Sequence, residues 1–118
     1  MDRECIFCEI ACKRKPSEMV FEDDKTVVFK DIRPKAPVHL LIVPKKHVLS
    51  IADLTEEDRG LAGDLVFMAK RMALEAGLDG YRLIFNVGRQ GGQLVDHIHL
   101  HLLGGWKGHT GEDFITTE

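Results

Sequence analysis

The feature that most constrains this chain is a run near its C-terminus in which histidine and aliphatic residues alternate: His97-Ile98-His99-Leu100-His101-Leu102-Leu103. Alternation with a period of two is typical of a β-strand, because successive side chains of a strand point to opposite faces. We therefore predict a strand over residues 97–103 that ends at Gly104-Gly105. Its three imidazoles share one face, and its aliphatic side chains pack against a core on the other face.

The spacing of the three histidines limits how they can be used. A strand rises about 3.3 Å per residue, so His97 and His101 begin roughly 13 Å apart. Zinc ligands lie about 2 Å from the metal, so the two outer histidines cannot easily hold one ion while the strand stays regular. Two neighbouring histidines can. The run therefore leaves open either a catalytic metal on two histidines or chemistry by the imidazoles themselves, because neutral imidazole is a nucleophile near pH 7.

The other periodic segments predict an α+β fold, because strand patterns cluster instead of alternating with helices. Residues 19–22 and 26–29 predict a hairpin, and residues 38–43 and 81–86 predict two further strands. With the histidine strand, these segments make a mostly antiparallel sheet of about five strands. Residues 5–12 predict a short N-terminal helix. One long helix is predicted over residues 54–76, and its buried stripe is Leu61, Leu65, Met68, Met72 and Ala76.

Composition argues against several classes of partner. The chain has 118 residues, which predicts a single domain over residues 1–118 with a C-terminal tail at about 106–118. Its net charge of −3 argues against a nucleic-acid partner, which usually meets a basic patch. No apolar run approaches the roughly 20 residues of a membrane helix, and no membrane association or organic cofactor is expected. The three cysteines are an odd number crowded at one end, which favours a reducing, cytoplasmic location.

The alternating run, His-φ-His-φ-His-φ-φ with φ aliphatic, resembles the signature of the histidine triad (HIT) nucleotide-binding proteins, and in particular the small Hint branch of purine nucleoside phosphoramidases. The resemblance extends from Cys5 to Gly105. It implies a HIT-like fold, a purine nucleotide of the AMP or GMP type as ligand, and a homodimer formed through the long helix and the strand after Gly80. The further matching stretches are Ile6-Phe7, Phe21-Glu22-Asp23-Asp24, Asp31-Ile32, Pro34, Ala36-Pro37, Pro44-Lys45-Lys46-His47, Asn86 and Gly91-Gly92-Gln93.

The resemblance also implies a role for each matching residue. His99 matches the nucleophile that becomes nucleotidylated, His101 lies beside the scissile phosphate, and His39 supports the site. Asn86 and the backbone of Gly92 match groups that contact the phosphate or the leaving group. The match to the nucleoside site consists of Asp31, which takes the ribose hydroxyls, and the apolar walls of the base pocket, Ile6, Phe7, Phe29 and Ile32.

Two positions depart from the Hint pattern. Leu94 stands where that pattern often has serine, so a hydroxyl that helps to protonate or orient a leaving amine is missing. This substitution bears on phosphoramidate preference and rate more than on nucleotide binding. Asp96 directly precedes the triad and is a candidate to orient a neighbouring imidazole.

The pair Cys5-x2-Cys8 is half of a structural zinc site, and His47 and His97 are the candidates for the other half. In related histidine triad proteins that carry this cysteine pair, two histidines at matching positions complete a Cys₂His₂ site. The alternative is a pair of reduced cysteines packed in a short helix. Cys12 is expected to be a buried free thiol.

Three functions follow from these observations. The favoured one is a nucleotide-binding hydrolase or transferase that cleaves at the α-phosphorus of nucleoside 5′-phosphoramidates or related nucleotides through covalent nucleotidyl-His99. Such an intermediate divides one difficult displacement into two easier ones. The second is a metal-dependent hydrolase with triad histidines as ligands. The third is a purine nucleotide sensor with little turnover, to which Leu94 gives weight.

Overall fold

A computed structural model describes residues 5–107, so most of the predicted C-terminal tail lies outside the described residues. No helix within this range is long and apolar enough to cross a bilayer. The elements in chain order are α1 (Ile6–Ala11), β1 (Met19–Glu22), β2 (Thr26–Lys30), β3 (Val38–Pro44), η1 (Ile51–Asp53), η2 (Glu56–Asp58), α2 (Arg59–Glu75), β4 (Tyr81–Ile84), η3 (Arg89–Gly91) and β5 (Leu100–Gly104), where η marks a 3₁₀-helix.

The five strands form one sheet in the order β1-β2-β3-β5-β4, and every neighbouring pair is antiparallel. The α+β prediction, with its long helix and its short N-terminal helix, is therefore confirmed. Chain-adjacent strands β1, β2 and β3 lie side by side, whereas the last strand inserts between β3 and β4. This insertion brings β5 against β3 and puts the triad segment next to His39.

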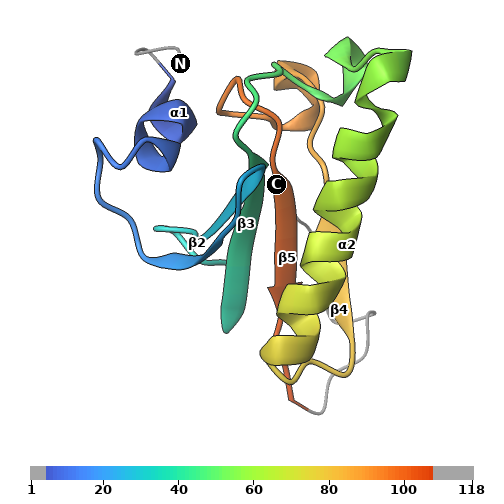
Figure 1. Ribbon diagram of the computed structural model, residues 1–118. Helices are drawn as coiled ribbons and strands as arrows, with labels where there is room; N and C mark the ends of the chain where they lie inside the picture. Colours follow the sequence, from blue (N-terminus) through green and yellow to red (C-terminus); the bar gives the residue numbers. More distant parts are fainter. Residues whose placement is uncertain (1–4, 108–118) are drawn as a thin grey trace.

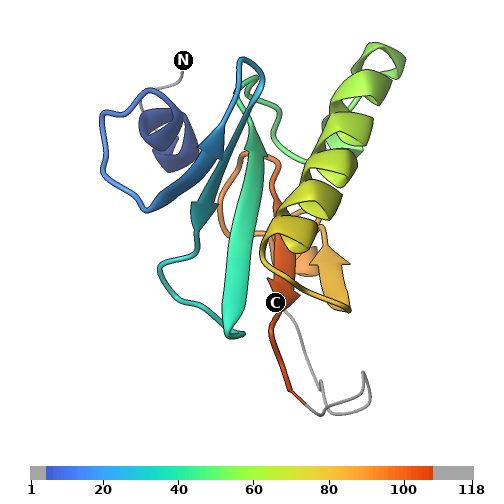
Figure 2. The same ribbon diagram turned by 60° about the horizontal axis from the view of Figure 1, so that its bottom comes forward.

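Period-two alternation separates the side chains of β3 and β5 into two cores on opposite faces of the sheet. Figures 1 and 2 both show α1 and α2 on opposite sides of this sheet. The α2 side of the sheet holds Leu40, Ile42, Ile98, Leu100 and Leu102, which pack with Leu65, Met68 and Met72 of the helix. The α1 side holds Val27, Phe29, Leu41 and Val43, which pack with Phe7, Cys8 and Ile10.

The long helix differs from its prediction at both ends. Thr55 and Asp58 form a capping box, but it closes the 3₁₀ turn η2, and the α-helix begins only at Arg59. The predicted stripe is buried at Leu65, Met68 and Met72 and half-buried at Leu61, whereas Ala76 is exposed. Ala76 is the C-cap, and Gly77 follows with a φ of 71°, so the chain has already turned away from the core there.

The predicted strand over residues 97–103 is wrong in its first half, because β5 begins at Leu100. The ladder between β3 and β5 ends at the pair Ile42 and Leu100, and its next hydrogen-bonded step would need a donor from Pro44, which has none. The N–H of Ile98 bonds instead to the Val48 carbonyl at 2.7 Å. The strand predicted over residues 81–86 likewise ends early, at Ile84, so Phe85 and Asn86 lie beyond it.

Candidate active site and metal site

The antiparallel register of β3 and β5 brings His39 and His101 together on the α1 side of the sheet. Leu41 pairs with His101, and His39 pairs with Leu103, so the two imidazoles are diagonal neighbours. His39 Nε2 lies 3.0 Å from His101 Nδ1, and the rings of His99 and His101 are 4.9 Å apart. All three histidines are buried. The sequence therefore places three imidazoles in one contiguous row, although only His101 belongs to the strand β5.

A chain of hydrogen bonds assigns the protons of His39 and His101. The backbone N–H of Lys35 donates to His39 Nδ1 at 3.1 Å, so neutral His39 carries its proton on Nε2. That proton points to His101 Nδ1, with the Asp31 carboxylate 3.4 Å away from the same nitrogen. His101 then carries its own proton on Nε2, a buried atom with no hydrogen-bond partner among the described residues. The site thus presents an N–H donor that an incoming oxygen can satisfy.

His99 carries its proton on the other ring nitrogen, Nδ1. Its Nδ1 lies 2.7 Å from the His97 carbonyl oxygen, which can only accept, so Nδ1 carries the proton and Nε2 keeps its lone pair. The ring of Phe7 meets His99 edge-on with centroids 4.9 Å apart. Burial lowers the pKa of His99 and that of His39, and it is the main cause that lowers the pKa of His101 to about 4. All three imidazoles are therefore neutral near pH 7.

Four sulfur and nitrogen donors gather at the start of α1. Ligand atoms of Cys5, Cys8, His47 and His97, called the Cys/His cluster below, all lie within 4.8 Å of one another. Cys5 caps α1, and its Sγ lies 3.3 Å from His97 Nδ1. Cys8 Sγ lies 3.2 Å from His47 Nδ1 and 3.5 Å from His97 Nδ1. Tetrahedral zinc holds sulfur and nitrogen ligands about 3.5 Å apart, so these distances fit the ion.

The protonation of His97 also fits metal binding. Its Nε2 lies 2.8 Å from the Pro44 carbonyl, which accepts the Nε2 proton and leaves a lone pair on Nδ1, toward the two sulfurs. Burial is the main cause that lowers the pKa of His97 to about 4, so the ring is neutral near pH 7. A neutral histidine with a carbonyl behind it is the usual form of a zinc ligand.

A second group of possible ligands, Asp31, His39 and His101, also lies within 4.8 Å. Here the hydrogen bonding opposes a metal. The Lys35 N–H occupies the lone pair of His39 Nδ1, so Nε2, the atom that faces the other two residues, carries a proton and has no lone pair to give. The two clusters therefore differ in chemistry: the Cys/His cluster suits a metal, and the second group suits proton-bearing contacts.

Comparisons with known proteins identify the family of this chain. The sequence profile described as "Scavenger mRNA decapping enzyme C-term binding" matches residues 4–111. Protein HitA of Neisseria gonorrhoeae is 45% identical over 101 residues, which cover 85% of this chain and 94% of that protein. The crystal structure of a HIT family hydrolase from Legionella pneumophila is 51% identical, with a TM-score of 0.85, and the match covers 87% of this chain and 94% of that one. The chain belongs to the histidine triad family.

A third relative in the HIT family bears on the Cys/His cluster. A zinc-bound histidine triad family protein from Mycobacterium smegmatis is 30% identical to this chain, with a TM-score of 0.78. The match covers 88% of this chain and 76% of that one. That protein binds zinc, and the donors of the present HIT chain fit the same ion.

The residues expected to form the nucleoside pocket of this HIT chain are divided between core and surface. Phe7 and Phe29 are buried and pack edge to face, with centroids 5.5 Å apart. Ile6 and Ile32 are exposed, and Ile32 exposes 85% of its surface. Asp31 is half-buried and accepts a hydrogen bond from the Arg33 N–H at 2.9 Å. The two isoleucines are therefore accessible from solvent, whereas the two phenylalanines belong to the core on the α1 side of the sheet.

Asn86 and Gly92 are not joined to the histidines by any hydrogen bond within residues 5–107. Gly92 has a φ of 91° and closes the η3 turn, while Asn86 is half-buried just beyond β4. Sequence reasoning assigned no role to Gln93, which holds this loop in place. Its Oε1 accepts from Gly88, and its Nε2 donates to the carbonyl of Leu49 at 2.6 Å. The signal was the amide side chain directly after Gly91-Gly92, in residues 91–95, which are otherwise glycine or apolar.

Two expectations about single residues are wrong. Asp96 does not orient an imidazole, because its carboxylate pairs with Arg89 at 3.1 Å on the surface. Cys12 is not buried: it is the exposed C-cap of α1, whose helix ends before its side chain can reach the core. Leu94 exposes 79% of its surface, so it presents an apolar side chain to solvent at the position discussed above.

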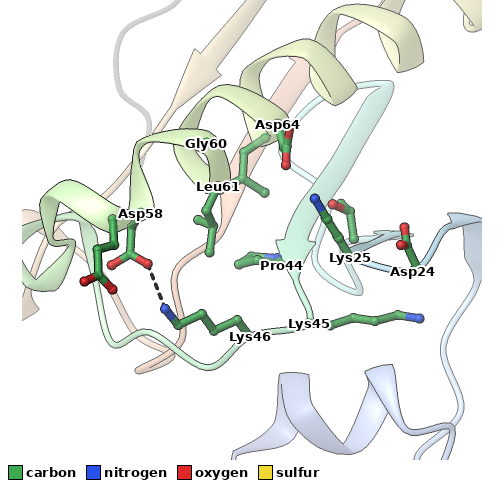
Figure 3. Close-up of a pocket in the computed structure, with 12 residues that line it drawn as sticks. Asp24, Lys25, Pro44, Lys45, Lys46, Asp58, Gly60, Leu61 and Asp64 are labelled. Carbon is green, nitrogen blue, oxygen red and sulfur yellow. Dashed lines mark hydrogen bonds and ion pairs between the residues drawn. The ribbon is translucent and has the colours of Figure 1, made fainter.

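A pocket of about 450 Å³ lies away from the histidines, where α2 begins and β3 ends. Figure 3 shows its mixed lining, which includes the ion pair between Lys46 and Asp58 at 2.7 Å. Lys45, also in the lining, pairs with Glu22 at 2.8 Å. Two of its lysines are thus already neutralised by carboxylates. In this HIT chain the nucleophilic and proton-donating atoms lie at the histidines and not at this cleft.

Proposed function

We propose that this histidine triad protein is a nucleotide-binding hydrolase or transferase that cleaves at the α-phosphorus of nucleoside 5′-phosphoramidates or related nucleotides. One observation carries the proposal: the His97 carbonyl takes the Nδ1 proton of His99, which leaves a neutral, buried imidazole with a lone pair on Nε2. A nucleophile of this kind is what displacement at phosphorus requires.

In the proposed reaction, His99 Nε2 attacks the α-phosphorus, and the bond between phosphorus and the leaving nitrogen breaks. The leaving nitrogen takes a proton from solvent and departs as the amine, and the water that later attacks phosphorus returns a proton to solvent. The intermediate keeps the Nδ1 proton, so it is a nucleotidyl-imidazolium whose charge the His97 carbonyl stabilises. Water or another acceptor then attacks phosphorus and restores neutral His99. Hydrolysis releases the nucleoside monophosphate.

The neighbouring groups take supporting roles in this proposal. The Nε2–H of His101, buried and without a partner among the described residues, donates to a phosphate oxygen. His39 holds His101 in that tautomer through its own hydrogen bond. The backbone of Gly92 and the amide of Asn86 contact the phosphate or the leaving group. Asp31 accepts the ribose hydroxyls, and the base, of purine type, rests against Ile6, Phe7, Phe29 and Ile32.

A structural zinc ion at the Cys/His cluster belongs to the same proposal. The donor set of two thiolates and two imidazoles is complete, so no position is left for a catalytic water. The ion would tie α1 to the loop after β3 and to the segment before β5. Thiolate ligands need a reducing compartment, so the cytoplasm is the proposed location. The alternative of a catalytic metal on the triad is disfavoured because the His39 Nε2 proton occupies the Nδ1 lone pair of His101, whose Nε2 then carries a proton.

A homodimer is proposed through α2 and β4. Val66, Phe67 and Leu74 are exposed on the helix, and Phe67 exposes 70% of its surface. β4 is an edge strand, with Tyr81 and Leu83 partly exposed beside it. An apolar helix face next to an open strand edge is a surface that association with a second copy would cover.

The test is the mass of the intact protein, measured under denaturing, neutral conditions after brief incubation with adenosine 5′-phosphoramidate, beside a product assay. We expect a transient gain of one nucleotidyl group in the wild-type protein. His99→Ala should lose both the adduct and turnover, while nucleotide affinity changes by only about 1–2 kcal/mol, the scale of one hydrogen bond. His109→Ala, which alters a histidine of the tail, is the matched control and should behave as wild type.

Two outcomes would count against the proposal. Full turnover in His99→Ala would exclude His99 as the nucleophile. Tight binding of nucleoside monophosphate with neither adduct nor product in the wild type would favour a nucleotide sensor, a function to which the exposed Leu94 gives weight.

A further inference from the structure

We propose that the Cys/His cluster does more than stabilise the fold: metal binding there orients the candidate nucleophile His99. The inference rests on the proposed function of His99 and adds a positioning role for His97 and for the peptide unit that joins His97 to Ile98. This peptide belongs to a metal-binding residue at one end and hydrogen-bonds the nucleophile through its carbonyl.

The peptide between His97 and Ile98 makes a hydrogen bond at each end. Its carbonyl accepts from His99 Nδ1 at 2.7 Å, and its N–H donates to the Val48 carbonyl, also at 2.7 Å. The orientation of this peptide plane therefore determines whether a hydrogen-bond acceptor faces His99 Nδ1. Without the acceptor, the proton of a neutral imidazole is free to move to Nε2, and the lone pair at that atom is lost.

The sheet does not hold this peptide. β5 begins at Leu100, and the ladder with β3 ends at the same residue. The peptide between His97 and Ile98 is held instead by its hydrogen bond to the Val48 carbonyl. Val48 lies in the loop after β3, outside any helix or strand. A peptide held by one loop carbonyl needs a further restraint if it is to keep a fixed orientation.

The cluster supplies that restraint on both sides. His47 directly precedes Val48, so its ring fixes the segment that accepts from the peptide N–H. His97 belongs to the peptide itself, and its ring lies between the cysteine sulfurs and the Pro44 carbonyl. A metal bound to both imidazoles clamps the two segments whose hydrogen bond sets the plane. Removal of the metal releases both, and the acceptor for His99 loses its fixed position.

The experiment compares zinc-loaded protein with protein stripped of metal by a chelator at pH 7.5, using the full chain labelled with ¹⁵N-histidine. The ring nitrogens report the tautomer directly, and the His99 signals are identified by their absence in His99→Ala. We expect the zinc form to carry the His99 proton on Nδ1 and the stripped form to shift toward Nε2. Adduct formation with adenosine 5′-phosphoramidate should slow by roughly tenfold to a hundredfold, the scale of a misplaced catalytic group. Binding of AMP should change less than twofold.

Three variants separate the metal from general loosening of α1. Cys8→Ser should lose the metal and reproduce the stripped form. Cys12→Ser changes an exposed thiol on the same helix and should retain the zinc form in every respect. Ile10→Ala removes buried contacts of α1 but leaves all four donors, so it should be less stable yet keep the His99 tautomer when loaded. Cobalt absorption, with its thiolate-to-metal bands, confirms ligation by sulfur in each protein.

A further comparison covers the case in which the stripped protein unfolds. Cadmium binds the same thiolates with longer bonds. It therefore keeps the fold but moves the ligand atoms farther from the metal. Here we expect a shifted His99 Nδ1 proton signal and slower adduct formation at unchanged AMP affinity. Identical His99 tautomer, signal and rate in the zinc and cadmium forms overturn the inference, and so does a protein that binds neither cobalt nor zinc. If no form gives an adduct, the proposed function fails, but the tautomer measurement still decides the metal's positioning role.

Discussion

Protonation of the His101 imidazole in the unfolded chain should lower the stability of the fold between pH 7 and pH 5. The side chain is buried beside His39 and His99, with Lys35 and Asp31 as the charged groups nearby. Burial, the two neighbouring histidines and Lys35 lower its pKa, and Asp31 opposes them, which leaves the pKa at about 4. In the unfolded chain the same imidazole titrates at about 6.5. Between these values the unfolded state binds more protons than the folded state, so stability is lost as the pH falls.

The size of the effect follows from the two pKa values. Once both states are protonated, the difference between about 6.5 and about 4 corresponds to a loss of about 3 kcal/mol in the free energy of unfolding. About 2 kcal/mol of this loss develops between pH 7 and pH 5. That is a large fraction of the stability of a small domain, so the effect is measurable by urea unfolding.

His101→Asn isolates this contribution. The asparagine carbonyl can accept from His39 Nε2 as His101 Nδ1 does, but it does not titrate. We expect the variant to lose about 2 kcal/mol less than the wild type between pH 7 and pH 5, measured from urea midpoints and m-values at both pH values. The Cys/His cluster is intact in both proteins, so any release of metal at low pH cancels in the comparison. An equal loss in the two proteins would refute the reasoning.

Two further predictions concern the surface. Leu94→Ser should raise turnover of adenosine 5′-phosphoramidate several-fold at unchanged AMP affinity, because a hydroxyl becomes available to orient the leaving amine; an unchanged rate would show that Leu94 does not limit the reaction. Phe67→Glu should shift the protein from dimer to monomer in size-exclusion chromatography with light scattering, because it places a charge on the exposed apolar face of α2. An unchanged mass would place the dimer contact elsewhere or exclude it.

The architecture was predictable because its signals are local or periodic. Sequence patterns predict the positions of three features to within a few residues: the hairpin of β1 and β2, the apolar strand β3 and the long helix. The errors lie at the ends of elements. β5 starts late because Pro44, on another strand, cannot continue the ladder, an effect that is not visible in the segment that it changes. α2 starts late for a local reason, because the capping box of Thr55 and Asp58, within the predicted segment, closes a 3₁₀ turn first.

The sequence predicted which residues form the site better than it predicted the hydrogen bonds that position them. The motif and the cysteine pair pointed to the histidines and to the four donors that lie together in the fold. The sequence did not indicate Gln93 as the side chain that fastens the glycine loop to Leu49, nor Val48 as the acceptor for Ile98. Asp96 was misread because its partner, Arg89, becomes a neighbour only when the loop folds back on itself.

The three triad histidines are chemically identical in the sequence, and main-chain groups make them different. The Pro44 carbonyl takes the Nε2 proton of His97 and leaves Nδ1 for a metal. The His97 carbonyl takes the Nδ1 proton of His99 and leaves Nε2 as a nucleophile. The Lys35 N–H, acting through His39, leaves His101 with an Nε2 proton to donate. Backbone groups carry no residue identity, so side-chain substitutions cannot remove them directly. Changes outside the three histidines should therefore alter their chemistry most at Pro44 and at Cys5, Cys8 and His47, the other members of the Cys/His cluster.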